Sequence, residues 1–84
     1  MGHARNRPKR LAEKLLQIRE ALGLSQKEMA ERLSERTGFT ITQTHVSNYE
    51  HDQGEPFLET TLAYARIASV EMNEIADDDV DLNL

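Results

Sequence analysis

Four polar side chains in the middle of the chain are of types that can read the edges of nucleic-acid bases. They are Gln43, Thr44, Ser47 and Asn48. Gln and Asn can pair with adenine through a donor and an acceptor at once, and a Thr methyl group can contact thymine. In a helix these side chains would lie opposite Val46 and Tyr49, which would face the core. The pattern predicts a base-reading surface, and the alternative is an ordinary polar helix face.

The element that would carry this surface is a helix from about residue 43 to residue 51. Thr42 can serve as its N-cap, since a threonine side chain accepts a hydrogen bond from the backbone of the first turn. The preceding stretch 38–42, Gly-Phe-Thr-Ile-Thr, is rich in β-branched and aromatic residues and predicts a short extended connector. We expect Phe39 and Ile41 to hold that connector against the core.

A stripe of apolar residues near the start of the chain predicts the first supporting helix. The stripe consists of Leu11, Leu15, Ile18 and Leu22. This spacing is i, i+4, i+7 and i+11, which places all four on one helical face. The helix is expected to run from about Pro8 to Leu22, with Gly23 as a left-handed cap at its end.

A second helix is expected directly afterwards. Ser25 and Glu28 have the spacing of a capping box, in which each side chain satisfies a backbone N–H of the other residue. The helix would span about 26–36 and stop at Gly38. Its inner face would be formed by Met29, Ala30 and Leu33.

Two more helices are expected after a turn at residues 52–54, Asp-Gln-Gly. Pro56 suits the first turn of a fourth helix that ends near Ser69, and a short fifth helix would span about 71–76. The residues expected to face the core from the fourth helix are Leu58, Leu62, Tyr64 and Ala65. No stretch alternates as a strand does. The sequence therefore predicts an all-α fold, a compact bundle of five short helices.

Charge is distributed unevenly along the chain. The net charge is −5, yet residues 1–36 hold nine Lys/Arg against five Asp/Glu, and residues 37–84 hold one against ten. A basic half can present a positive face to phosphate despite a negative total, although both halves could also be merely solvated. The chain divides into a basic arm at 1–8, one domain at 9–76 and an acidic tail at 77–84. The tail is expected to be loose apart from Val80 and Leu82.

Several classes of site are disfavoured by composition. The chain has no cysteine, which excludes disulfides and thiolate metal sites and favours a reducing, cytoplasmic setting. His3, His45 and His51 lack metal-ligand spacing. No glycine-rich phosphate loop or nucleophile–base pair is readable, and no apolar run is long enough to span a bilayer. We therefore expect no enzyme, no metal or other cofactor, and no membrane partner.

Residues 18–33 (IREALGLSQKEMAERL) and 46–50 (VSNYE), followed by the segment 56–70, occur in an order typical of one known family. They resemble the phage-repressor family of helix-turn-helix proteins, which is Cro/cI-like and also called the xenobiotic-response-element family. The resemblance covers about residues 9–76 and implies a lambda-repressor-like fold. The connection from Leu33 to Val46 is longer than the tight turn of that family.

The resemblance implies how such a chain contacts double-stranded DNA. In this motif the second helix crosses the DNA backbone and the third lies in the major groove. Base contacts are implied at three positions, Gln43, Thr44 and Asn48. Ser47 suits either base or phosphate. Ser25 stands at a helix N-terminus, where free N–H groups attract phosphate, and the resemblance implies that Gln26 adds its side-chain amide. The phosphate candidates are Ser25, Gln26, Lys27, Arg10 and Lys14.

Two further expectations concern Arg19, Glu50 and the basic arm. The resemblance implies a salt bridge between Arg19 and Glu50 that fixes the third helix on the scaffold. If this pair were exposed instead, it would be worth under about 1 kcal/mol. The arm residues would reach phosphate or a minor groove, or else make no contact; they are His3, Arg5, Arg7, Lys9 and Arg10.

The function implied by the resemblance is that of a homodimeric repressor of transcription on a partly palindromic operator. The expected dimer surface consists of Ile67, Val70, Met72 and Ile75. Two alternatives stay open. One is a protein-interaction module with weak DNA affinity that binds a protein partner through its acidic half. The other is an antitoxin that regulates its own operon.

Overall fold

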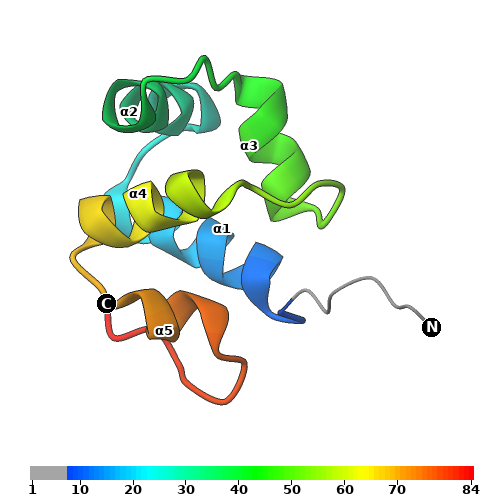
Figure 1. Cartoon of the computed structure of the whole chain (residues 1–84), viewed down its shortest axis with the longest axis vertical. Helices are drawn as coiled ribbons and strands as arrows, with labels where there is room; N and C mark the ends of the chain where they lie inside the picture. The colour runs from blue at the N-terminus through cyan, green and yellow to red at the C-terminus, as the bar shows by residue number, and fades with distance from the viewer. Residues whose placement is uncertain (1–7) are drawn as a thin grey trace.

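Five helices make up the part of the chain that the structure, a computed structural model, describes, which is residues 8–84 (Figure 1). They are α1 (Leu11–Leu22), α2 (Gln26–Thr37), α3 (Gln43–Glu50), α4 (Leu58–Ala68) and α5 (Met72–Ala76). Residues 8–84 contain no strand, so the predicted all-α bundle of five short helices is confirmed. α1 packs against α3, α4 and α5, while α2 packs against α3 and α4.

The N-terminus of α1 differs from the prediction: the helix begins at Leu11 rather than near Pro8. The backbone N–H groups of Lys9 and Arg10 both donate to the carboxylate of Asp78, at 2.9 Å each. A carboxylate at this place satisfies donors that a helix N-terminus leaves free and also suits the helix dipole. The cap of α1 is thus supplied by a residue from the other end of the chain.

The N-terminus of α2 has the predicted capping box. The backbone N–H of Glu28 donates to Ser25 Oγ at 3.0 Å, and the backbone N–H of Ser25 donates to Glu28 Oε1 at 2.8 Å. These hydrogen bonds to Ser25 lower the pKa of the Glu28 carboxyl. Gly38 adopts the left-handed conformation at the other end, where its N–H donates to the carbonyl of Ser34. Both signals for α2 are therefore confirmed.

The core is formed where α1, α2, α3 and α4 meet, and α5 adds Ile75 to it. Its fully buried side chains include Leu15, Ile18, Met29, Leu33, Val46 and Tyr64. Small Ala30 is also buried between α2 and its neighbours, and Leu22 is only partly buried. The periodic apolar residues of the first two helices thus supply most of this core, as the sequence predicts.

The connector between α2 and α3 is held differently from the prediction. Ile41 is buried as expected, but Phe39 is 42% exposed and packs edge-on against Phe57, with ring centroids 6.2 Å apart. The connector is held by Ser34, whose hydroxyl accepts from the Ile41 N–H at 2.9 Å and donates to the Ile41 carbonyl at 3.0 Å. The Ser34 hydroxyl of α2 therefore holds the connector by hydrogen-bonding both backbone polar groups of Ile41.

The inner face of α4 was also predicted partly wrong. Tyr64 and Ala65 are buried, but Leu58 and Leu62 are exposed. The helix begins at Leu58 with Phe57 as its N-cap, and this start turns Thr60 and Thr61 toward the core. Leu58 and Leu62 lie one turn apart on the opposite face.

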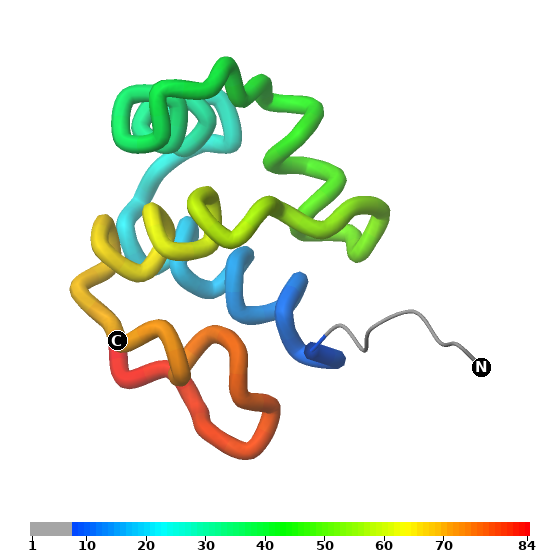
Figure 2. Tube along the Cα trace, in the orientation of Figure 1, coloured from blue at the N-terminus to red at the C-terminus, as the bar shows by residue number. Residues whose placement is uncertain are grey.

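The C-terminal segment 77–84 is packed against the bundle, so the prediction of a loose tail was wrong. It follows α5 and turns back beside that helix (Figure 2). Val80 and Leu82 are partly buried, and the N–H of Asn83 donates to Glu74 Oε1 at 2.8 Å. Two acidic residues of this segment, Asp78 and Asp81, are paired with the basic start of α1, which helps to explain why the segment is packed.

Candidate nucleic-acid interface

α3 is set in place by a cap and by its buried inner face. The Thr42 hydroxyl accepts from the backbone N–H of His45 at 3.2 Å, which confirms Thr42 as the N-cap. Val46 is fully buried against the other helices, and Tyr49 is half-buried. Removal of the Tyr49 ring from water raises the pKa of its hydroxyl. The first turn of this helix, Gln43, Thr44 and His45, is exposed to solvent.

The predicted bridge between Arg19 and Glu50 joins the end of α1 to the end of α3. Arg19 Nε lies 2.6 Å from Glu50 Oε2, and Arg19 Nη2 lies 2.9 Å from Glu50 Oε1. The side chains are 17% and 2% exposed, so this two-pronged pair is largely withdrawn from water. Hydrogen bonding to Glu50 raises the pKa of Arg19, which therefore stays charged. The geometry confirms a salt bridge that anchors α3 to the scaffold.

Gln26 completes this anchor. Its Nε2 donates to Glu50 Oε1 at 3.0 Å, so the start of α2 is tied to the end of α3 through one carboxylate. The side-chain amide predicted to meet phosphate thus has one of its two N–H groups engaged inside the protein. Its contact with phosphate stays a prediction.

The predicted base-reading residues lie away from the core. Gln43 and Thr44 are exposed in the first turn, and Ser47 and Asn48 are half-buried one turn later. The side chains of Gln43, Thr44 and Asn48 make no hydrogen bond to another residue within 8–84. Ser47 Oγ lies 3.5 Å from a ring nitrogen of His51. The structure therefore brings the four together on one rigid helix with most of their polar atoms available.

His45 belongs to this surface, although the sequence reasoning considered it only as a metal ligand. Its ring is exposed and stacks beside Tyr49, with centroids 6.5 Å apart and 14° between planes. Its Nδ1 accepts from the Thr42 N–H at 3.0 Å, so the neutral ring carries its proton on Nε2. The spacing from Thr42 to His45 is that of a capping box and could have pointed to this role.

The N-terminus of α2 presents a second set of donors. The backbone N–H groups of Gln26 and Lys27 have no acceptor within residues 8–84, as is usual for the first turn of a helix. Ser25 and Lys27 are exposed beside them. Free N–H groups, the positive end of the helix dipole and a lysine together suit a phosphate group.

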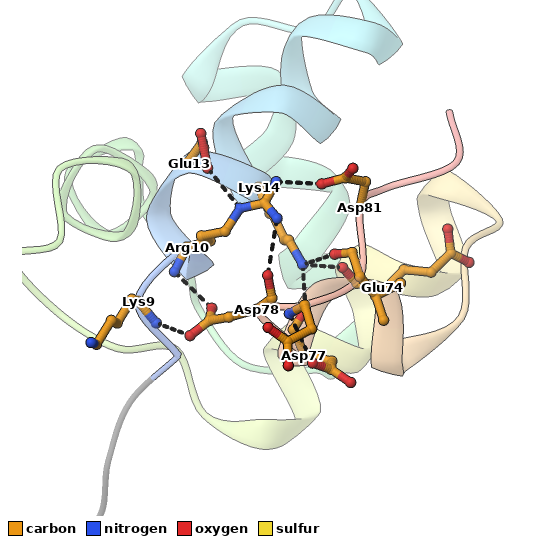
Figure 3. A network of polar contacts seen from close by, with 10 residues as sticks. Lys9, Arg10, Glu13, Lys14, Glu74, Asp77, Asp78 and Asp81 are labelled. Carbon is orange, nitrogen blue, oxygen red and sulfur yellow. Dashed lines mark hydrogen bonds and ion pairs between the residues drawn. The ribbon is translucent and has the colours of Figure 1, made fainter.

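Lys14 was predicted to contact phosphate, and the structure shows this to be wrong. Its side chain is fully buried, and its ammonium group donates to the carbonyls of Glu74 at 2.7 Å, Asp77 at 2.7 Å and Val80 at 2.5 Å (Figure 3). These three carbonyls accept all three of its donors. Lys14 instead closes the C-terminal end of α5.

Arg10 is also occupied by the C-terminal segment (Figure 3). Its guanidinium pairs with Asp81 at 2.8 Å and Glu13 at 3.2 Å, and donates to the carbonyl of Asp78 at 3.0 Å. These carboxylates, Asp81 first, raise the pKa of Arg10. A DNA phosphate would therefore compete with Asp81 for this guanidinium.

The predicted dimer surface is contradicted at one of its four residues, Ile75. Ile75 is fully buried in the core and cannot meet a second molecule. Ile67, Val70 and Met72 are partly buried and pack against the core. The basic-arm residues His3, Arg5 and Arg7 lie outside the described residues.

Two other kinds of site can be checked over residues 8–84. No group of three or more His, Cys, Asp or Glu side chains in this part could hold a metal ion. None of the helices there is long and apolar enough to cross a membrane.

Comparisons with known proteins agree with this geometry. The helix-turn-helix family profile matches residues 15–75. The P22 c2 repressor, solved in complex with a synthetic operator, is 20% identical, and the likeness covers 82% of this chain and 96% of that one at a TM-score of 0.63. The restriction-modification controller protein C.AhdI from Aeromonas hydrophila is 27% identical over 79% of this chain and 91% of that one, at a TM-score of 0.58. No protein of curated function matches the chain. The phage-repressor likeness seen in the sequence is confirmed.

Proposed function

The chain belongs to the helix-turn-helix family of the phage-repressor type, and we propose that it binds double-stranded DNA as a sequence-specific regulator of transcription. The observation that carries this proposal is the polar face of α3, where Gln43 and Thr44 are exposed and Asn48 is half-buried, on a helix whose C-terminal end is anchored by Arg19. A polar face on a rigid helix about as wide as the major groove is what direct reading of bases requires.

Anchoring matters because base reading depends on position. The carboxylate of Glu50 is bound by Arg19 and Gln26, so α3 is fixed at its C-terminal end to both α1 and α2. With α3 in the major groove, the first turn of α2 would meet the phosphate backbone through its free N–H groups, Ser25 and Lys27. Phosphate contacts would set the register, and the side chains of α3 would select the sequence.

We further propose that the protein acts as a homodimeric repressor on a partly palindromic operator. A two-fold dimer would place its two α3 helices about 34 Å apart, which is one turn of DNA. The likeness to a repressor whose solved complex contains an operator supports this. Such a regulator works on DNA in the cytoplasm and needs no catalytic activity of its own.

The test is selection of binding sites from a random duplex pool. We expect the wild type to enrich a partly palindromic site at moderate salt. Asn48→Ala should lose discrimination at one base pair by about 1–3 kcal/mol. Asn73→Ala makes the same change at an exposed position on α5 and should leave the preference unchanged. Absence of any enriched site would exclude sequence-specific binding.

The negative net charge of the chain favours a second candidate function. The net charge of −5 disfavours DNA and suits a module that binds another protein. Binding to DNA that weakens steeply with salt would favour the regulator, since neutralised phosphates release counterions. A flat salt response together with capture of a protein partner would favour the module.

A further inference from the structure

Two histidines at opposite ends of α3 use the same ring nitrogen for hydrogen bonds of opposite sense. His45 lies in the first turn, and its Nδ1 accepts from the backbone N–H of Thr42 at 3.0 Å. His51 follows the last turn, and its Nδ1 lies 2.7 Å from the carbonyl oxygen of Ser47. A backbone N–H only donates and a carbonyl oxygen only accepts. Nδ1 is therefore unprotonated in His45 and protonated in His51.

The consequence appears at Nε2, the other ring nitrogen. A neutral imidazole carries a single proton, so His45 has it on Nε2 and His51 has an unprotonated Nε2. Both side chains are exposed, and neither Nε2 atom has a hydrogen-bond partner within residues 8–84. Because Nδ1 of His45 faces the backbone of Thr42, its Nε2 points away from that backbone. The start of α3 thus presents an N–H donor, whereas the end of α3 presents an acceptor.

The His45 ring is held in one orientation from two sides. The hydrogen bond from Thr42 fixes one edge, and the half-buried Tyr49 ring stacks beside it, with 6.5 Å between centroids and 14° between planes. His45 follows Thr44 directly and lies one turn before Asn48, so it borders the polar face of α3. A donor that is already oriented loses little side-chain freedom when it binds.

From these contacts we propose that His45 is a further residue of the DNA interface, which donates through its Nε2–H to an acceptor atom of the duplex. The inference rests on the proposed function and adds the chemical type of the group that is selected. In the major groove the acceptors are purine N7, guanine O6 and thymine O4, and phosphate oxygens line its edges. Cytosine presents an N4 amino donor there, so a cytosine facing His45 would bring two donors together.

The first test is the position of the ring protons in the full chain without DNA. Long-range proton–nitrogen NMR should be recorded at about pH 8, where histidine side chains are neutral. We expect a protonated Nε2 in His45 and a protonated Nδ1 in His51. His51 is the matched control, because a general effect of solvent would give both exposed rings the same pattern. Averaged signals from two tautomers in His45 would overturn the inference.

The second test removes the donor and leaves the cap intact. The chain has 84 residues and can be made by chemical synthesis with Nε2-methylhistidine in place of His45. The methyl group replaces the Nε2 proton, while Nδ1 still accepts from Thr42 and the ring still stacks on Tyr49. The unfolding midpoint should therefore match that of the wild type. Affinity for the selected duplex should fall about fivefold or more, since one hydrogen bond is lost.

Replacement of single acceptor atoms in the duplex identifies the partner of His45. The replacements are 7-deazapurines for N7, 2-aminopurine for guanine O6, 4-thiothymine for thymine O4, and methylphosphonates for phosphate oxygens. One of them should weaken the wild type about fivefold and leave the methylated protein unaffected, which isolates the pair from any steric effect of the methyl group. A modified base would identify a specificity contact, and a methylphosphonate would identify a contact that only positions the helix.

Two results on the selected duplex would overturn the inference alone. One is equal affinity of the wild type and the methylated protein. The other is a set of atom replacements that each cost both proteins the same. Failure of the proposed function looks different, because the wild type would then select no duplex; the DNA contact of His45 would fall with it, even if both ring protons were found as expected.

Discussion

Removal of Arg19 tests how firmly α3 is anchored. The bridge to Glu50 has two short contacts, 2.6 and 2.9 Å, and the Glu50 side chain is only 2% exposed. Loss of one member of a buried pair leaves the other charge without its partner and costs about 3–5 kcal/mol. A chain of 84 residues has a total stability of about 4–13 kcal/mol, so this loss is large. Arg19→Met should lower the unfolding midpoint by about 12 °C or more.

The assay is urea and thermal unfolding followed by circular dichroism. Arg19→Met combined with Glu50→Met should be more stable than Arg19→Met alone, because no unpaired charge then stays buried. Glu13→Gln is the control, since Glu13 belongs to an exposed ion pair with Arg10, and its midpoint should stay near that of the wild type. A cost under about 1 kcal/mol for Arg19→Met, or strict additivity in the double variant, would refute the anchor.

Three further predictions concern the C-terminal segment and the end of α4. Lys14→Met should destabilise the protein by about 3 kcal/mol or more in urea unfolding, because three carbonyls lose a buried ammonium donor. Almost no change in stability, as expected for an exposed lysine, would contradict these contacts. The N–H groups of Arg10 and Lys9 lower the pKa of Asp78 below its ordinary 3.8, so its contribution to stability is full above about pH 4 and is lost as the pH falls through the lowered value. The difference in urea midpoint between wild type and Asp78→Asn should therefore be present at pH 7 and shrink in acid, and a constant difference would contradict this. Ser69→Gly should stabilise the protein by about 1 kcal/mol in the same assay, because Ser69 ends α4 in the left-handed conformation at φ 58°; a loss of stability would count against that reasoning.

The features predicted correctly from the sequence are those that depend on neighbouring residues. The capping box of Ser25 and Glu28 and the apolar stripe through Leu15 and Ile18 both act within one helix, so local spacing is sufficient to find them. The placement of Gln43 and Asn48 on one outward face follows from the same helical period. The salt bridge of Arg19 and Glu50 is not local, and only the family resemblance pointed to it.

The errors arose where distant segments meet. Lys14 was placed on the surface because lysine seldom lies in a core, but its partners are carbonyls at the far end of the chain. Leu58 was placed in the core because it is apolar, whereas the start of α4 turns Thr60 inward instead. Neither the cap of α1 by Asp78 nor the exposure of Phe57 leaves a periodic signal, so neither could be found without the packing of the elements.

The most direct test of the base-reading surface is a titration of the labelled protein with a selected duplex, followed by backbone amide NMR shifts. We predict that the largest shifts occur at residues 43–48 of α3 and at the first turn of α2, and that α5 is little affected. Largest shifts in α5 and the C-terminal segment 77–84, with α3 unchanged, would contradict the claim that α3 enters the DNA groove.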